Sequence, residues 1–156
     1  MPYHCPQCGA TYSTDETCAS RFNDCQAREF SDPAYFAVHH LSVPCFMLQH
    51  DHYSRAGWIR VWRLLVRFLD GLAPEQARRD ARKAGAGGNR MPSLTRGPKL
   101  VGVAAVTWSR TIADVRRDSA EQYCADVRAW TAQVVRDAEE LMRTVDGAPR
   151  GEDAEG

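Results

Sequence analysis

The feature that most constrains this chain is the cysteine-rich segment HCPQCGATYSTDETC at residues 4–18. Cys5 and Cys8 form a Cys-x-x-Cys pair, which brings two thiolates onto one turn, and Cys18 follows ten residues later. Gly9 permits the positive φ that often follows such a knuckle. The spacing predicts one side of a tetrahedral metal site at the N-terminus, and the remaining ligands must come from elsewhere in the chain.

The compartment expected for the chain favours metal binding over disulfides. The start of the sequence, MPYHCPQC, lacks the basic and apolar regions of a secretion signal, and no apolar run is long enough to cross a bilayer. We therefore expect a cytoplasmic protein without membrane association, in which the six cysteines stay reduced. Thiol redox chemistry at the Cys-x-x-Cys pair is the alternative. Such pairs usually open a helix in a βαβ unit, which this sequence does not predict.

Helix signals dominate the rest of the sequence and predict an all-α fold. We expect a single-domain bundle of four to five helices with an N-terminal zinc knuckle in residues 1–12. Two capping boxes, Ser13-x-x-Glu16 and Ser119-x-x-Gln122, predict the starts of the first and the last helix. Pro33 fits the first position of the second helix, and Gly71 fits the end of the third. Pro44 predicts a kink or a broken turn inside that second helix. The predicted helices cover residues 14–30, 33–50, 55–70, 74–85 and 120–145.

The segments between these helices have weaker signals. Residues 85–99 are rich in glycine and proline and predict a flexible loop. Residues 101–108 are ambiguous between extended chain and coil, and residues 112–117 predict a short helical turn. We expect one metal-binding domain over residues 1–146 and a disordered, acidic tail over residues 147–156.

The choice of further ligands depends on how the first two helices pair. The candidates are His4, Cys18, Cys25, His39, His40, Cys45, His50, His52 and Cys124. If the two helices form an antiparallel hairpin that turns near Asp32, Cys25 lies level with His39. Cys18 then lies level with Phe46, about one helical turn from His50.

His39 and His50 cannot both bind one ion on a continuous helix, because eleven residues span about 16 Å. We favour Cys5, Cys8, Cys18 and His50, a closed Cys₃His set that indicates a structural zinc, with His39 as the alternative ligand.

Other polar and thiol groups have simpler interpretations. Glu29 falls on the inner stripe of the first helix, and a buried Glu29–His39 hydrogen bond is favoured over metal binding by His39. Cys25, Cys45 and Cys124 fall on apolar helical faces and are expected in the core.

The motifs of residues 5–50 resemble those of an uncharacterised bacterial family, a domain of unknown function. The shared features are CPQCGA, Cys18, REFSDPAYFAVHH and LQH, which match the family's CPxCGA start, its Glu-Tyr/Phe-x-Asp-Pro-Ala-Tyr motif, a His and a Gln-His pair. The resemblance marks Cys5, Cys8, Cys18, Glu29, His39, Gln49 and His50. It implies no known reaction. The chain departs from the family at Val43-Pro44-Cys45-Phe46, where the family reads close to Val-Asp-Ala-Tyr.

Three functions follow from these patterns. We expect a zinc-binding helical protein whose metal is structural and which acts through an unknown protein partner. The alternative is a metal-dependent enzyme of hydrolase type, with an open zinc position and Glu29 as general base. Nucleic-acid binding is disfavoured. Residues 55–99 carry eleven Lys and Arg against three Asp and Glu, a local charge of 11 − 3 = +8, but the whole chain is neutral. No aromatic residues interleave for base stacking.

Overall fold

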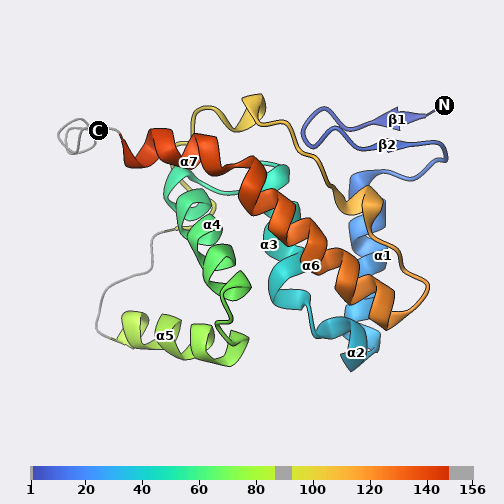
Figure 1. The fold of residues 1–156 in the computed structure, drawn as a ribbon, viewed down its shortest axis with the longest axis horizontal. Helices are drawn as coiled ribbons and strands as arrows, with labels where there is room; N and C mark the ends of the chain where they lie inside the picture. The colour runs from blue at the N-terminus through green and yellow to red at the C-terminus, as the bar shows by residue number, and fades with distance from the viewer. Residues whose placement is uncertain (1, 87–92, 148–156) are drawn as a thin grey trace.

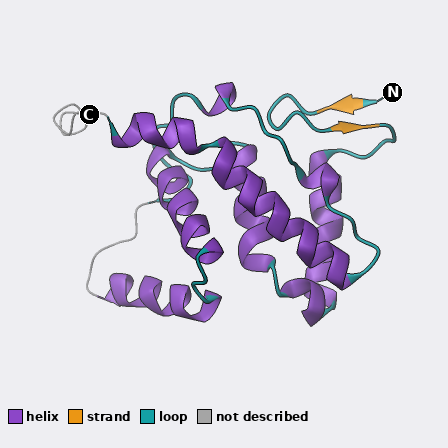
Figure 2. Ribbon diagram, viewed as in Figure 1, coloured by secondary structure: helices purple, strands orange, loops and turns teal. Residues whose placement is uncertain are grey.

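The computed structural model describes residues 2–86 and 93–147 (Figure 1). Over these residues the fold is helical apart from one short hairpin, so the predicted all-α class is confirmed (Figure 2). The predicted tail, apart from Gly147, and part of the predicted loop, residues 87–92, lie outside the described residues. The elements in chain order are β1 (Tyr3–His4), β2 (Thr11–Tyr12), α1 (Cys18–Ser31), α2 (Pro33–Phe36), α3 (His39–Gln49), α4 (Arg55–Leu69), α5 (Pro74–Ala86), η1 (Val103–Ala105), η2 (Ile112–Asp114), α6 (Ala120–Asp137) and α7 (Glu139–Asp146).

The N-terminal knuckle is held between two very short strands. β1 and β2 pair antiparallel, with Tyr3 opposite Tyr12 and His4 opposite Thr11. Two residues per strand are too few to show an alternating pattern, so the sequence predicted only a knuckle and loop here. None of the described helices is both long and apolar enough to span a membrane.

The start of α1 differs from the prediction by one turn. The predicted Ser13-x-x-Glu16 box does not cap the helix; Thr17 does. Its hydroxyl accepts from the Ser20 N–H at 3.1 Å, and the Ser20 hydroxyl accepts from the Thr17 N–H at 2.9 Å. This reciprocal pair satisfies two of the free amides at the helix start, and it makes Cys18 the first residue of α1.

The predicted helix over residues 33–50 is divided, and the division is not at the proline. Asp32 caps α2, its carboxylate accepting from the Ala34 N–H at 2.9 Å, with Pro33 in the first position as predicted. The helix breaks after Phe36, and the chain re-enters a helix at His39, with Val38 fully buried between. Pro44 lies inside α3, and the helix continues through it to Gln49 with one backbone donor fewer.

The predicted helix over residues 120–145 is also divided. Ser119 caps α6 by accepting from the Gln122 N–H, as predicted, but the helix ends at Asp137 and α7 begins at Glu139. The Asp137 carboxylate accepts hydrogen bonds from the Ser109 N–H at 2.7 Å and from the Ser109 hydroxyl at 2.9 Å. The divided helices explain why seven α-helices occur in the described residues where four to five were expected.

The break at residues 37–38 sets the register between α1 and α3. Cys18 lies beside His50, Phe22 stacks on Phe46 with ring centroids 4.0 Å apart, and Glu29 bonds His39. The sequence-based hairpin placed Cys25 level with His39 and Cys18 level with Phe46. The register is therefore four residues, about one helical turn, away from that prediction, because α2 takes up a turn of its own.

The core forms where α3, α4 and α6 meet (Figure 1). Trp58 and Trp130 are fully buried there, and each indole N–H finds a partner: Trp58 donates to the Leu48 carbonyl at 3.2 Å, and Trp130 to the Gln49 side-chain oxygen at 3.1 Å. These bonds join α3 to both neighbouring helices and fix its orientation toward the N-terminal knuckle.

Candidate metal centre

Four metal-ligand side chains from three separate segments meet at one end of the helical core. Cys5 and Cys8 come from the loop between β1 and β2, Cys18 from the start of α1, and His50 from the end of α3. Their ligand atoms all lie within 4.8 Å of one another, and all four residues are buried. The structure thus brings together the four residues favoured from the sequence, and the group could hold a metal ion.

The knuckle is shaped by its own backbone hydrogen bonds. The Cys5 N–H donates to the Ala10 carbonyl at 2.8 Å, and the Gly9 N–H donates back to the Cys5 carbonyl at 3.0 Å. Gly9 has φ +83°, in the left-handed region where a side chain would be strained, as the sequence predicted. This tight loop turns both cysteine sulfurs toward the start of α1.

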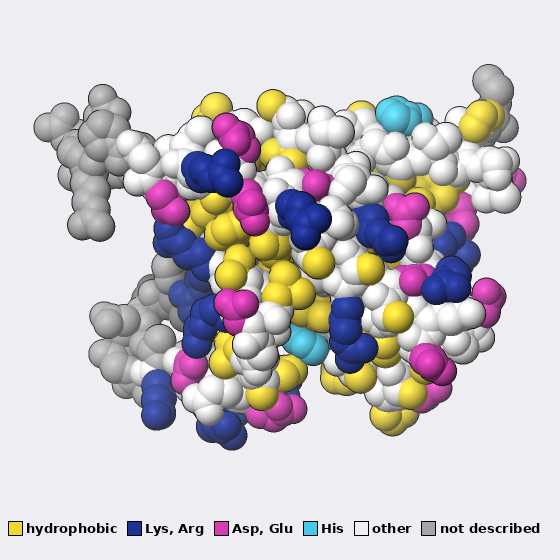
Figure 3. Space-filling view, in the orientation of Figure 1, with side chains coloured by type: hydrophobic (Ala, Val, Ile, Leu, Met, Phe, Trp, Pro, Cys, Tyr) yellow, Lys and Arg dark blue, Asp and Glu magenta, His cyan; other side chains and the backbone are white. Residues whose placement is uncertain are grey.

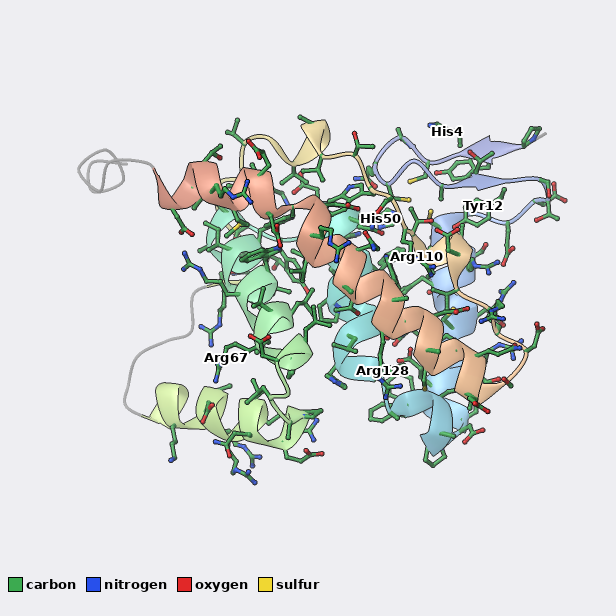
Figure 4. The ribbon with its side chains drawn as sticks, viewed as in Figure 1. His4, Tyr12, His50, Arg67, Arg110 and Arg128 are labelled. Atoms are coloured by element: carbon green, nitrogen blue, oxygen red, sulfur yellow. The ribbon has the colours of Figure 1, made fainter. Side chains whose placement is uncertain are left out.

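His50 is oriented for binding through Nε2. Its Nδ1 donates to the Phe46 carbonyl at 2.8 Å, and its ring stacks on Phe46 with centroids 4.2 Å apart. Nε2 is buried and has no hydrogen-bond partner among the described residues, although it lies among the three sulfurs. A buried nitrogen without a partner is costly, whereas a metal ion would satisfy it. Figure 4 shows His50 at the end of α3 that faces the hairpin.

Two further side chains support the four ligands from outside. The Tyr12 hydroxyl donates to Cys18 Sγ at 3.2 Å, and the Gln7 amide donates to the His50 carbonyl at 3.0 Å. Donors of this kind orient ligands and stabilise thiolate charge. Sequence reasoning missed both residues. Tyr12 pairs with Tyr3 across the hairpin, and a hairpin prediction would have been needed to place it.

Hydrogen bonding between the thiols favours a thiolate at Cys18, which suits the binding of a cation. Cys8 and Cys18 are hydrogen-bonded at 3.5 Å, and this bond lowers the pKa of Cys18 and raises that of Cys8. His50 and Tyr12 lower the pKa of Cys18 further. Burial, followed by donation to Cys18, raises the pKa of Tyr12, so the tyrosine stays a donor. Metal binding would displace the proton between the sulfurs, because thiolates are the ligands.

The spacing of the sulfurs fits a tetrahedral ion. Zinc–sulfur bonds of about 2.3 Å in a tetrahedron place the sulfurs roughly 3.8 Å apart. The Cys8–Cys18 separation of 3.5 Å and the 4.8 Å limit on the whole group are close to that spacing. Little rearrangement is therefore needed to coordinate one ion.

His39 and Glu29 form a separate buried network at the other end of α1. His39 Nδ1 bonds Glu29 Oε1 at 2.7 Å, and Glu29 Oε2 accepts from the Ser42 hydroxyl at 2.7 Å and from the Tyr123 hydroxyl. The favoured Glu29–His39 hydrogen bond is thus present. Glu29 follows Cys18 by eleven residues in one helix, about 16 Å along its axis. This geometry gives no support to Glu29 as a base for water on the metal.

The remaining candidate ligands lie apart from the group. His4 is exposed, with its Nδ1 3.2 Å from the Thr11 hydroxyl, and points away from the sulfurs (Figure 4). His40 packs edge-on against Phe68. The cysteines expected in the core are buried there: Cys25, Cys45 and Cys124.

Comparison with known proteins gives a family and no function. Searches against curated proteins and against solved structures gave no significant match. The model of DUF5946, described as a family of unknown function, matches residues 3–139, a range that includes the knuckle, α1 and α3. The resemblance seen in the motifs of residues 5–50 is therefore confirmed at the level of the family, and the chain belongs to DUF5946.

Proposed function

We propose that this protein binds one structural zinc ion through Cys5, Cys8, Cys18 and His50 and acts by binding a partner. The observation that carries the metal assignment is His50 Nε2, buried without a hydrogen-bond partner in the described chain and surrounded by three sulfurs. Three thiolates and one imidazole form a soft set that favours zinc over hard cations such as magnesium. Because the thiols must stay reduced to bind, we place the protein in the cytoplasm.

A structural role is favoured over catalysis by the number of ligands. Four protein ligands complete a tetrahedron and leave no position for a substrate or an activated water. The nearest candidate base considered from the sequence, Glu29, is already engaged with His39, Ser42 and Tyr123. The ion would instead join the knuckle to α1 and α3, so its binding energy would add to the folding energy.

The test is metal content and coordination in protein purified without added metal. We expect one zinc per chain, with X-ray absorption showing three sulfurs at about 2.3 Å and one nitrogen at about 2.0 Å. Cys18→Ser and His50→Ala should lose the metal or bind it far more weakly. His39→Ala is the matched control, a histidine of the same helix that lies outside the group, and it should keep its zinc.

Two other results would contradict the proposal. A spectrum with two sulfurs, nitrogen and a light oxygen ligand, together with zinc loss in His39→Ala, would indicate an open, enzyme-like site. Protein without metal that forms a reversible disulfide between Cys5 and Cys8 would return the pair to thiol redox chemistry.

A further inference from the structure

A groove lies between α4 and α5. Both helices lie on the side of the molecule away from the β1–β2 hairpin (Figure 1). The volume of the groove is about 470 Å³, within the range of binding sites that receive defined ligands. Ile59 and Leu64 of α4 and Leu94 line it on one side, and Ala77 and Ala81 of α5 line it on the other.

The groove exists because α5 turns small side chains toward α4. A second hollow of about 270 Å³ also involves Leu64, Ala77 and Ala81 and is bordered by Phe68. Apolar side chains of α4 therefore line both hollows. A concave, largely apolar surface with a few polar groups at its edge is the usual form of a binding site.

The edge of the groove is basic. Arg60, Arg63 and Arg67 line it at spacings of three and four residues, so they form a row about 10 Å long on one face of α4. Figure 3 shows basic side chains gathered along the edge of the molecule where α4 and α5 lie, and Figure 4 shows Arg67 between the two helices.

Two of these arginines already hold carboxylates of the same chain. Arg67 pairs with Asp80 at 3.6 Å and Arg63 with Asp146 at 2.7 Å. All four side chains are at least two-fifths exposed, and exposed pairs contribute little stability, so they can be exchanged at small cost. The pairs show that these two guanidinium groups can hold carboxylates at this edge of the groove.

We propose that this groove receives an acidic amphipathic helix of a protein partner. This inference rests on the proposed partner-binding function and names the chemistry of the partner. An apolar stripe on the incoming helix would cover Leu64 and Leu94, which are partly exposed, and carboxylates beside that stripe would pair with Arg63 and Arg67. The local charge of +8 over residues 55–99 would attract such a segment. The rest of the chain would repel it, because the whole chain is neutral and the remaining residues therefore carry 0 − 8 = −8.

The arrangement of charge favours a helix over other anionic ligands. A fatty acid has a single anionic headgroup, which would use one arginine of a row of three. A nucleic acid offers many phosphates, but the described lining of the groove is mainly apolar and includes no aromatic residue on which bases could stack. A row of cations beside an apolar groove is complementary to carboxylates spaced one helical turn apart.

The experiment measures binding of a designed probe to the zinc-loaded full chain. The probe is a fluorescein-labelled peptide of about 18 residues, long enough to form a helix, with leucines at i, i+3, i+4 and i+7 and glutamates on either side of them. Fluorescence anisotropy should show saturable binding that weakens as salt rises. A peptide of the same composition in scrambled order should bind at least about tenfold more weakly, because it lacks the apolar stripe.

Variants locate the binding to the groove. Arg63→Glu combined with Arg67→Glu should raise the Kd at least about tenfold, and a peptide with lysines in place of the glutamates should restore binding to this double variant. Ala77→Trp, which fills the groove, should abolish binding. Arg79→Glu is the control, because Arg79 lies on α5, is absent from the groove lining and bonds the neighbouring Gln76. It should change the Kd less than about twofold.

Each contrary result overturns the assignment. The inference is wrong if the acidic peptide fails to bind, if the scrambled peptide binds equally, or if Arg79→Glu weakens binding as much as the double variant does. Saturable binding of palmitate or of single-stranded DNA in place of the peptide would assign the groove to those ligands. Zinc content is measured on the same samples, so loss of peptide binding with zinc retained contradicts only the groove assignment.

Discussion

Two histidines at the opposite ends of α3 are used in different ways: His39 is its first residue, and His50 directly follows its last. Each directs Nδ1 to an oxygen, His50 to the Phe46 carbonyl and His39 to the Glu29 carboxylate. Their Nε2 atoms differ: that of His50 is buried among sulfurs, whereas the His39 side chain is 31% exposed. The surroundings of Nε2 therefore separate a candidate ligand from a member of a hydrogen-bond network.

Glu29 is the most constrained residue of that second network. Its side chain is fully buried and accepts from Ser42, Tyr123 and His39, and burial followed by the bond to Glu29 raises the pKa of Tyr123. Replacing it with glutamine would turn two amide hydrogens toward groups that donate. We expect Glu29→Gln to lower the free energy of unfolding by roughly 3 kcal/mol, measured by urea denaturation of the zinc-loaded protein.

Glu16→Gln is the control for this prediction. Glu16 pairs with Arg21 and Arg117 but is 27% exposed, so its loss should cost at most about 1 kcal/mol. Equal effects of the two variants would show that the buried network around Glu29 has no special part in stability.

At the scale of elements, helix ends position the metal centre. α1 begins at a candidate ligand, Cys18, because Thr17 and Ser20 cap it there. α3 ends at Gln49, and Asp51 adopts φ +53°, so the chain turns away directly after His50. Cys18 is thus the first residue of α1, and His50 is the residue directly after α3. Both candidate ligands lie where the direction of the backbone changes.

The cap of α1 is testable by single substitutions. Thr17→Ala removes one side of the reciprocal cap and should lower stability by about 1 kcal/mol. It should also weaken zinc binding, because the first turn carries Cys18. Thermal unfolding and competition with a chromogenic chelator would measure the two effects.

Ser13→Ala is the matched control for the cap, since Ser13 belongs to the predicted box that does not form. It should change stability by less than about 0.5 kcal/mol. If Ser13→Ala proved the more damaging substitution, α1 would begin in solution where the sequence pattern placed it.

At the scale of the whole molecule, the metal centre lies at the edge of one continuous buried core. Cys5, Cys8 and Cys18 belong to the same buried cluster as Trp58 and Trp130. The knuckle is joined to the helices at Cys18 and His50 and by the bonds of Tyr12 and Gln7, whereas both tryptophans bond to α3 without involving any of the four candidate ligands. Removing the metal should therefore release the hairpin before it disrupts the helices.

Chelation tests this order of events. A ligand that binds only the folded state stabilises it by about 2.7 kcal/mol at 100 times its Kd, so treatment with a strong chelator should lower the melting temperature. Helical circular dichroism should remain at 25 °C, while amide exchange speeds up for residues 3–12. Complete loss of helical signal on chelation would contradict the prediction and make zinc a requirement for the whole fold.

Much of the architecture could be predicted from local patterns. The helix over residues 55–70 matches α4, and Pro33, Gly71 and Ser119 lie at helix ends as expected, because capping depends on a few neighbouring residues. The breaks at residues 37–38 and at Ala138 were missed. Both Val38 and Ala138 are fully buried, so packing against distant residues, absent from any local window, decides where these helices divide.

The sequence by itself determined the all-α class, the two thiolates of the knuckle and the short set of residues that could complete it. These depend on spacing along the chain, which local geometry limits. Sequence reasoning favoured His50 as the fourth ligand and a Glu29–His39 bond, but only the tertiary structure brought these side chains together, set His39 level with Glu29 in place of Cys25, and placed Tyr12 against Cys18. The physical reason is register: a one-turn break between α2 and α3 shifts every contact between α1 and α3 by four residues.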